Sequence, residues 1–144
     1  MTRTQTHHPI TNAVVARIRA VGRPAALEAL KGIYQGVAPE KTEYPFVVYN
    51  LAAAPYDYLF GDDTTLIAMI DLTVYSRKSI EAEDLDAALA GWLSDQSLPV
   101  TGQTTLLCRR VATIPTSPDV DDEGNVIYSW GGTYEVQTDA PPLA

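Results

Sequence analysis

A long apolar run reads Leu66-Ile67-Ala68-Met69-Ile70-Asp71-Leu72-Thr73-Val74-Tyr75. Its even-numbered positions are all apolar, whereas its odd-numbered positions turn polar after Met69. Alternation with a period of two predicts a β-strand, and a first half that is apolar on both sides predicts burial on both faces. We therefore expect a long strand over residues 64–76 at the centre of a sheet.

The segments beside this run predict a second strand and a long helix. Tyr44 to Leu51 is rich in β-formers, with Pro45 suited to a strand start or an edge, and Gly61-Asp62-Asp63 is a turn signal that makes the two strands antiparallel neighbours. Ser79 is the expected N-cap of a helix that runs through Asp95. Its apolar stripe has helical spacing and consists of Leu85, Ala88, Leu89, Trp92 and Leu93.

The two ends of the chain complete an α+β pattern. We expect a helix from Thr11 or Asn12 to Gly22, with an apolar stripe of Val14, Val15, Ile18 and Val21. A short helix from Pro24 to Gly32 is expected to bury Leu27 and Leu30. A short strand over Ile33 to Val37 follows it. Two further strands are expected over Thr104–Ile114, with Leu106, Cys108 and Ala112 on one side, and over Val126–Thr138, where Gly131-Gly132 indicates a bulge or bend.

This order predicts a mainly antiparallel sheet of about four to five strands, with the long helix and the N-terminal helical pair packed on one face. We expect a flexible arm over residues 1–9, a single α+β domain over 10–138 and a frayed tail over 139–144. The length of 144 residues with 46% hydrophobic and 19% charged residues agrees with one globular domain.

Composition excludes several classes of protein. The net charge of −8 disfavours non-specific nucleic-acid binding, and a single cysteine excludes an internal disulfide. No segment resembles a membrane span or the hydrophobic core of a signal peptide, so we expect a soluble protein made in the cytosol. Residues 1–36 nevertheless carry five of the ten basic residues and one of the 18 acidic residues. This asymmetry fits either a cationic helix face or a docking surface for an acidic partner.

Local motifs for chemistry are absent. The acidic loop Asp119-Val120-Asp121-Asp122-Glu123-Gly124 fails the calcium-loop pattern at Glu123 and at Trp130, and we interpret it as a solvated turn. Cys108 has cationic neighbours, but its place in a strand favours a buried inert thiol. His7-His8 lies in the arm, and the pairs Asp62-Asp63 and Asp121-Asp122 lie in turns, so we predict no catalytic, cofactor-binding or metal residue.

Two segments carry a family resemblance. Gly32-Ile33-Tyr34-Gln35-Gly36-Val37-Ala38-Pro39, followed by Tyr44-Pro45-Phe46-Val47-Val48-Tyr49, resembles the opening of the tail-completion, or tail-terminator, proteins of tailed bacteriophages. The segment Asp71 to Ser76, the helix through Ala87 and Leu89, and Tyr134-Glu135-Val136 fall where that family has its central strand, long helix and last strand. The match covers roughly residues 10–138.

The resemblance implies a non-enzymatic virion subunit that assembles in the bacterial host cytoplasm. It would form a ring, hexameric in this family, that caps the head-proximal end of the tail tube and meets the tube protein and the head-tail connector. DNA would pass through the lumen without sequence-specific binding, and no membrane or cofactor is implied. The alternatives are another head-tail connector or tail-tube ring subunit, or a bacterial small-molecule-binding α+β domain.

Two expectations about assembly follow. Subunits are expected to meet through an exposed sheet edge at Tyr44–Leu51 or Val126–Thr138. The acidic loop either lies around a common axis or against the neighbouring subunit, where repulsion opposes closure and salt favours it, or it is a solvated hairpin tip far from any contact.

Overall fold

The computed structural model describes residues 8–53, 56–57, 65–94, 105–114 and 118–139, and everything below concerns that part of the chain. Its elements are the α-helices α1 (His8–Ile18) and α2 (Ser79–Leu93), the 3₁₀ helix η1 (Ala25–Ala29), and the strands β1 (Ile33–Gln35), β2 (Phe46–Ala53), β3 (Tyr56–Asp57), β4 (Thr65–Ser76), β5 (Thr105–Ile114), β6 (Asp119–Val120) and β7 (Val126–Asp139). The α+β class is confirmed, and the short strands β3 and β6 are additions to the predicted order.

The sheet is built around β4, as its alternation predicts. The strand order is β1-β2-β4-β7-β5, with β3 added beside β4 and β6 beside β7. The β4–β7 ladder is antiparallel and unbroken from Thr65 opposite Asp139 to Ser76 opposite Tyr128. β2 and β4 are antiparallel neighbours, which confirms that prediction, whereas β1 runs parallel to β2 and makes the sheet mixed.

The bulge expected at Gly131-Gly132 lies elsewhere. Both glycines pair in register with Thr73 and Leu72 of β4, so β7 is continuous there. The β5–β7 ladder instead shifts register between Arg110 and Ala112. The extra residue moves Ala112 off the buried face, and the prediction that Ala112 shares a side with Cys108 is wrong: Cys108 is buried and Ala112 is exposed.

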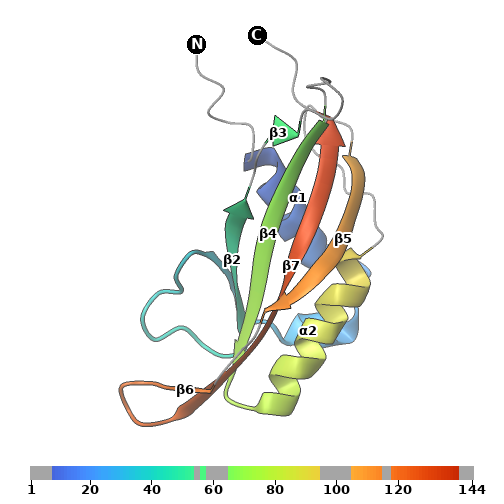
Figure 1. The fold of residues 1–144 in the computed structure, drawn as a ribbon. Helices are drawn as coiled ribbons and strands as arrows, with labels where there is room; N and C mark the ends of the chain where they lie inside the picture. Colours follow the sequence, from blue (N-terminus) through green and yellow to red (C-terminus); the bar gives the residue numbers. More distant parts are fainter. Residues whose placement is uncertain (1–7, 54–55, 58–64, 95–104, 115–117, 140–144) are drawn as a thin grey trace.

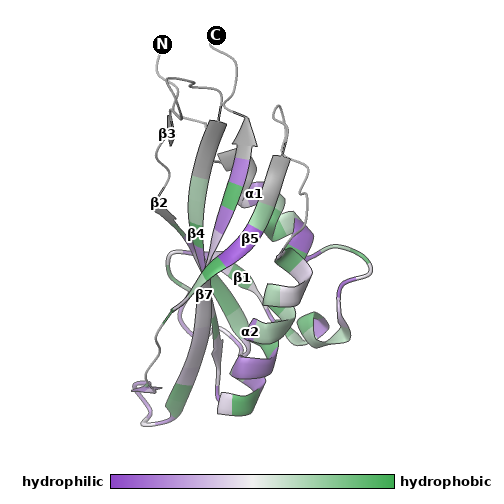
Figure 2. Ribbon diagram, turned by 45° about the vertical axis from the view of Figure 1, so that its right-hand side comes forward, coloured by the Kyte–Doolittle hydropathy of each residue, from purple (hydrophilic) through white to green (hydrophobic). Residues whose placement is uncertain are grey.

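The helices cover one face of the sheet (Figure 1 and Figure 2). α1 begins at His8, before the predicted caps Thr11 and Asn12. It ends at Ile18 because the chain tightens there: the N–H of Ala20 donates to the Arg17 carbonyl, three residues back. Val21, predicted to be in the buried stripe, is therefore fully exposed, while Val14 and Ile18 are buried.

The N-terminus of α2 is capped differently from the prediction. Lys78 occupies the cap position in an extended conformation, and Ser79 is already helical. The buried Ser76 accepts a hydrogen bond from the Lys78 N–H at 3.1 Å and donates to Glu81 at 2.6 Å. Ser76 at the end of β4 thus joins the strand to the helix.

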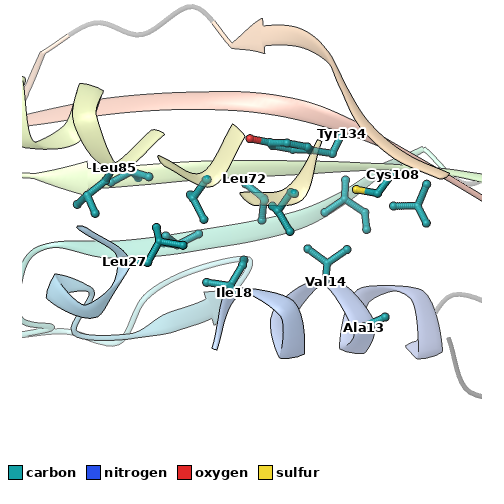
Figure 3. Packing of buried hydrophobic residues seen from close by; sticks show 14 of the residues in the cluster. Ala13, Val14, Ile18, Leu27, Leu72, Leu85, Cys108 and Tyr134 are labelled. Atoms are coloured by element: carbon teal, nitrogen blue, oxygen red, sulfur yellow. The ribbon is translucent and has the colours of Figure 1, made fainter. Parts of the chain in front are cut away.

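The core lies between the sheet and the helices (Figure 3). Its α2 members are Ala82, Leu85, Leu89 and Leu93, with Ala88 and Trp92 packed against them, which confirms the predicted stripe. Leu27 of η1 is buried there and Leu30 partly so, as predicted. None of the described helices is long and apolar enough to cross a membrane.

Candidate functional site

A polar cluster within the fold joins α2 to β5 and β7. The guanidinium of Arg110 donates to the Asp86 carboxylate and to the Gly131 carbonyl, both at 2.9 Å. It also lies 5.9 Å from the centre of the Tyr134 ring. Because a Cβ at Gly132 would fall 2.5 Å from Nε of Arg110, this glycine leaves the space that the side chain crosses.

The electrostatics of this cluster are those of a packed interior. Burial raises the pKa of the Tyr134 phenol to about 12, so it stays protonated at neutral pH. Oδ1 of Asp86 and the Tyr134 hydroxyl are buried without a hydrogen-bond partner among the described protein atoms. The cluster holds elements together and presents no open face to a substrate. The sequence does not predict the burial of Asp86, because an acidic residue beside an apolar stripe is ordinarily expected to face solvent.

Cys108 offers no accessible reactive group. Cys108 is fully buried, and burial raises the pKa of its thiol to about 12, so the nucleophilic thiolate is suppressed; the predicted burial is confirmed. His7 and the pair Asp62-Asp63 lie outside the described residues, and His8 is described only as the first residue of α1. No three His, Cys, Asp or Glu side chains of the described part gather as metal ligands.

The acidic loop is a defined hairpin. β6 pairs with the start of β7, placing Val120 opposite Val126, and we call residues 119–127 the acidic hairpin. It projects beyond the end of the sheet, at the lower left of Figure 1. Both valines are largely solvent-exposed, at 59% and 41%. An apolar pair is thereby displayed beside the carboxylates of Asp119, Asp122 and Glu123.

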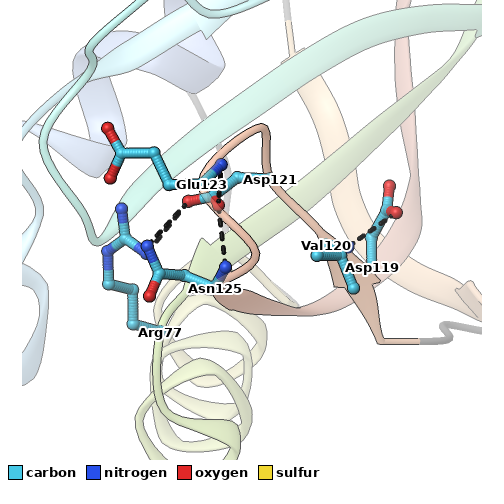
Figure 4. Close-up of polar contacts among 6 residues, drawn as sticks. All are labelled: Arg77, Asp119, Val120, Asp121, Glu123 and Asn125. Carbon is cyan, nitrogen blue, oxygen red and sulfur yellow. Dashed lines mark hydrogen bonds and ion pairs between the residues drawn. The ribbon is translucent and has the colours of Figure 1, made fainter.

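Asp121 fixes the shape of this hairpin (Figure 4). Its carboxylate accepts the N–H groups of Glu123 and Asn125, each at 2.9 Å, and pairs with Arg77 at 3.2 Å. These hydrogen bonds, with that of the Asn125 N–H first, lower the pKa of Asp121. Arg77 also lies 4.6 Å from the centre of the Tyr44 ring, so the turn is tied to the body of the protein.

The basic N-terminal quarter forms a groove between α1, η1 and β1. Its lining includes Ile18 and Leu27, which are buried, and Leu30, which is partly buried. Arg19, Arg23 and Lys31 stand at its rim. We call these six residues the basic groove. Within the described residues, none of the three cations forms an ion pair with a carboxylate.

The sheet edges differ from those expected. Val126–Thr138 belongs to β7, which pairs with β4 and β5 and is therefore interior rather than an edge. The other expected edge, in β2, is covered by β1 along Val47, Val48 and Tyr49. In the described part of the chain the outermost strands are β1 and β5.

Comparison with known proteins identifies a shared fold. No family model and no curated protein matches this chain. A solved structure described as the virion of a native gene transfer agent particle contains a chain that aligns with a TM-score of 0.67 over 95% of this chain and 99% of that chain, at 13% identity. A second solved chain aligns with a TM-score of 0.44 at 15% identity, too low to support an argument. The α+β fold described here is thus similar, from end to end, to that of a chain in a phage-like particle.

Proposed function

We propose that this chain is a structural protein of a phage-like virion and that it acts as the tail terminator. The observation that carries the proposal is the end-to-end likeness to a chain of the gene transfer agent virion, which leaves almost no part of either chain unmatched. The order of the tail-terminator motifs along residues 10–138 supports the finer assignment. In this role, copies of the chain form a ring, expected to be hexameric, at the head-proximal end of the tail tube.

The distribution of polar groups agrees with a subunit that works through its surfaces. The thiol of Cys108 and the phenol of Tyr134, which could act as nucleophiles when ionised, are protonated and buried. The exposed apolar side chains include Val120 of the acidic hairpin and Val37 after β1. Such side chains are suited to contacts with the tube protein, the head connector or another copy.

Particles produced with and without this chain test the proposal. With the chain, antibody labelling is expected at the head-proximal end of each tail, and cryo-electron microscopy is expected to show a closed ring there. Without it, tubes are expected to lose their fixed length and to remain separate from heads. A label distributed along the tube or confined to the head vertex would identify a tube or connector subunit instead, and particles lacking the chain altogether would refute a virion role.

A further inference from the structure

The acidic hairpin has an exposed apolar pair and an ordered turn, two features that suit docking to another surface. Val120 and Val126 face each other across its two strands and are exposed, although valine is ordinarily buried. Asp121, Arg77 and Asn125 hold the turn in one shape through their hydrogen bonds. A hairpin that is ordered before binding loses little conformational entropy when it docks.

The basic groove has the complementary chemistry. Within a volume of about 310 Å³ it offers the partly buried Leu30 as an apolar contact, since Ile18 and Leu27 are buried. Its rim offers three cations, whereas the hairpin offers an apolar pair flanked by Asp119, Asp122 and Glu123. Apolar contact at the centre with opposite charges at the periphery is the usual organisation of a protein interface.

The two surfaces lie apart within one molecule. In Figure 1 the hairpin projects at the lower left, while η1, drawn in light blue, lies behind α2 on the right. A hairpin therefore meets a groove only on another copy of the chain. Contact between two different surfaces of identical subunits is head-to-tail, and a head-to-tail contact that closes on itself makes a ring.

We propose that the acidic hairpin of one copy docks into the basic groove of the next copy, with Val120 and Val126 against Leu30. The inference rests on the proposed ring and names the contact that closes it. It places the carboxylates of Asp122 and Glu123 beside Arg19 and Lys31 of the neighbour. Salt then weakens association, because screening reduces attraction between these groups; if the loops instead crowded around a common axis, salt would strengthen it.

Charge reversal tests the contact in the full chain. Reversing the hairpin with Asp122→Lys and Glu123→Lys, or the groove with Arg19→Glu and Lys31→Glu, is expected to weaken self-association at least tenfold in sedimentation velocity. A mixture of the two variants is expected to associate again, since each supplies the surface that its partner requires. The matched control is Glu83→Lys with Asp84→Lys, which makes the same change in charge on the exposed face of α2 and is expected to associate normally. Normal association of both reversed variants, or stronger association with added salt, would overturn the proposal.

Crosslinking within assembled particles separates this inference from the proposed function. The double variant Lys31→Cys and Asp122→Cys places exposed thiols on the two surfaces, while the native Cys108 is buried. A short bismaleimide is expected to join copies into a ladder of covalent oligomers, and neither single variant is expected to do so. Rings without a ladder would refute the docking while leaving the tail role intact, whereas absence of the chain from tails would refute the tail role itself.

Discussion

Arg17 of α1 and Trp92 of α2 each donate a side-chain hydrogen bond to the backbone carbonyl of the other. The indole N–H of Trp92 lies 2.7 Å from the Arg17 carbonyl oxygen, and Nε of Arg17 lies 3.2 Å from the Trp92 carbonyl oxygen. The guanidinium carbon is also 3.5 Å from the centre of the indole ring. Two hydrogen bonds and a cation–π contact therefore clamp the helices together across 75 residues of sequence.

Removing either half of this clamp is expected to destabilise the fold. Trp92→Phe deletes the N–H donor and leaves the Arg17 carbonyl without it, so we expect a loss of about 1–3 kcal/mol in the free energy of unfolding. Arg17→Ala and the double variant complete a cycle whose coupling energy is expected to be about 1 kcal/mol. Urea unfolding measures these values, with Arg19→Ala, at the exposed position that follows α1, as the control. Additive effects would show that the two residues do not act together.

The pair of Asp86 and Arg110 leads to a second prediction. Because both side chains are mostly buried, Arg110→Met leaves a carboxylate in the interior without its cation, at an expected cost of about 2–4 kcal/mol. The double variant Asp86→Leu with Arg110→Met removes both charges and is expected to recover much of that loss. Thermal unfolding of the single and double variants measures the difference.

Arg109 provides the control for that experiment. It is half exposed and lies 3.8 Å from Glu135, so Arg109→Met is expected to change stability by less than about 0.5 kcal/mol. An equal loss in Arg109→Met and Arg110→Met would contradict a special role for the buried pair.

Two glycines are expected to respond in opposite directions to alanine. Gly132→Ala would force the Arg110 guanidinium out of its place and away from Asp86, and we expect a loss of about 1–3 kcal/mol. Gly91 lies in α2, and a Cβ added there would have no atom within 4 Å, so Gly91→Ala is expected to stabilise the protein by about 0.5–1 kcal/mol. Denaturant midpoints compare the two, and a neutral Gly132→Ala would show that Arg110 has a second conformation of equal energy.

Much of the fold follows from periodicity. The alternation along Leu66–Tyr75 predicts the central strand, and the stripe from Leu85 to Leu93 predicts the face of α2, because burial on one side imposes a repeat on the sequence. The errors occur where a single contact overrides the local pattern. Lys78, whose N–H donates to Ser76, takes the cap position expected for Ser79, and the chain tightens at Ala20 before Val21 can join the helix face.

The candidate surfaces were predictable only in part. The acidic loop and the basic start of the chain are visible as charge runs. Their shapes are not visible in the sequence. The β6–β7 pairing involves two residue pairs, too few to leave a periodic pattern, and the groove depends on how α1, η1 and β1 pack against one another. The Gly131-Gly132 pair shows the same limit: two glycines in a strand indicate a close approach, but only the structure identifies Arg110 as the side chain that approaches.

Cys108 is expected to be unreactive in the native protein. Its thiol is buried and its pKa is raised to about 12, so labelling by a disulfide reagent at pH 8 requires opening of the sheet. We expect labelling to accelerate steeply with urea, and Cys108→Ser to cost about 1–3 kcal/mol because the hydroxyl enters an apolar site. Fast labelling in the absence of urea would contradict the burial.

The shape of the acidic hairpin is expected to depend on the ionisation of Asp121. The pKa of its carboxyl is lowered in the folded protein, chiefly by the hydrogen bond from the Asn125 N–H. A group whose folded pKa lies below its unfolded value stabilises the fold at any pH above the unfolded value, about 3.9 for aspartate, and that contribution disappears as the pH falls through the folded pKa. We therefore expect a constant hairpin at neutral pH and a loosened turn in strong acid.

Carboxyl NMR titration and amide exchange measure this effect directly. The Asp121 resonance is expected to titrate below the ordinary aspartate range, and the amides of Glu123 and Asn125 are expected to lose protection over the same interval. Asp121→Asn keeps an oxygen that accepts both N–H groups, so its turn is expected to stay ordered without that pH dependence. Arg77→Met removes the ion pair and the cation beside the Tyr44 ring, and it is expected to raise the pKa of Asp121 partway, because the backbone hydrogen bonds remain. A normal aspartate titration in the natural chain would show that these hydrogen bonds do not hold the hairpin in solution.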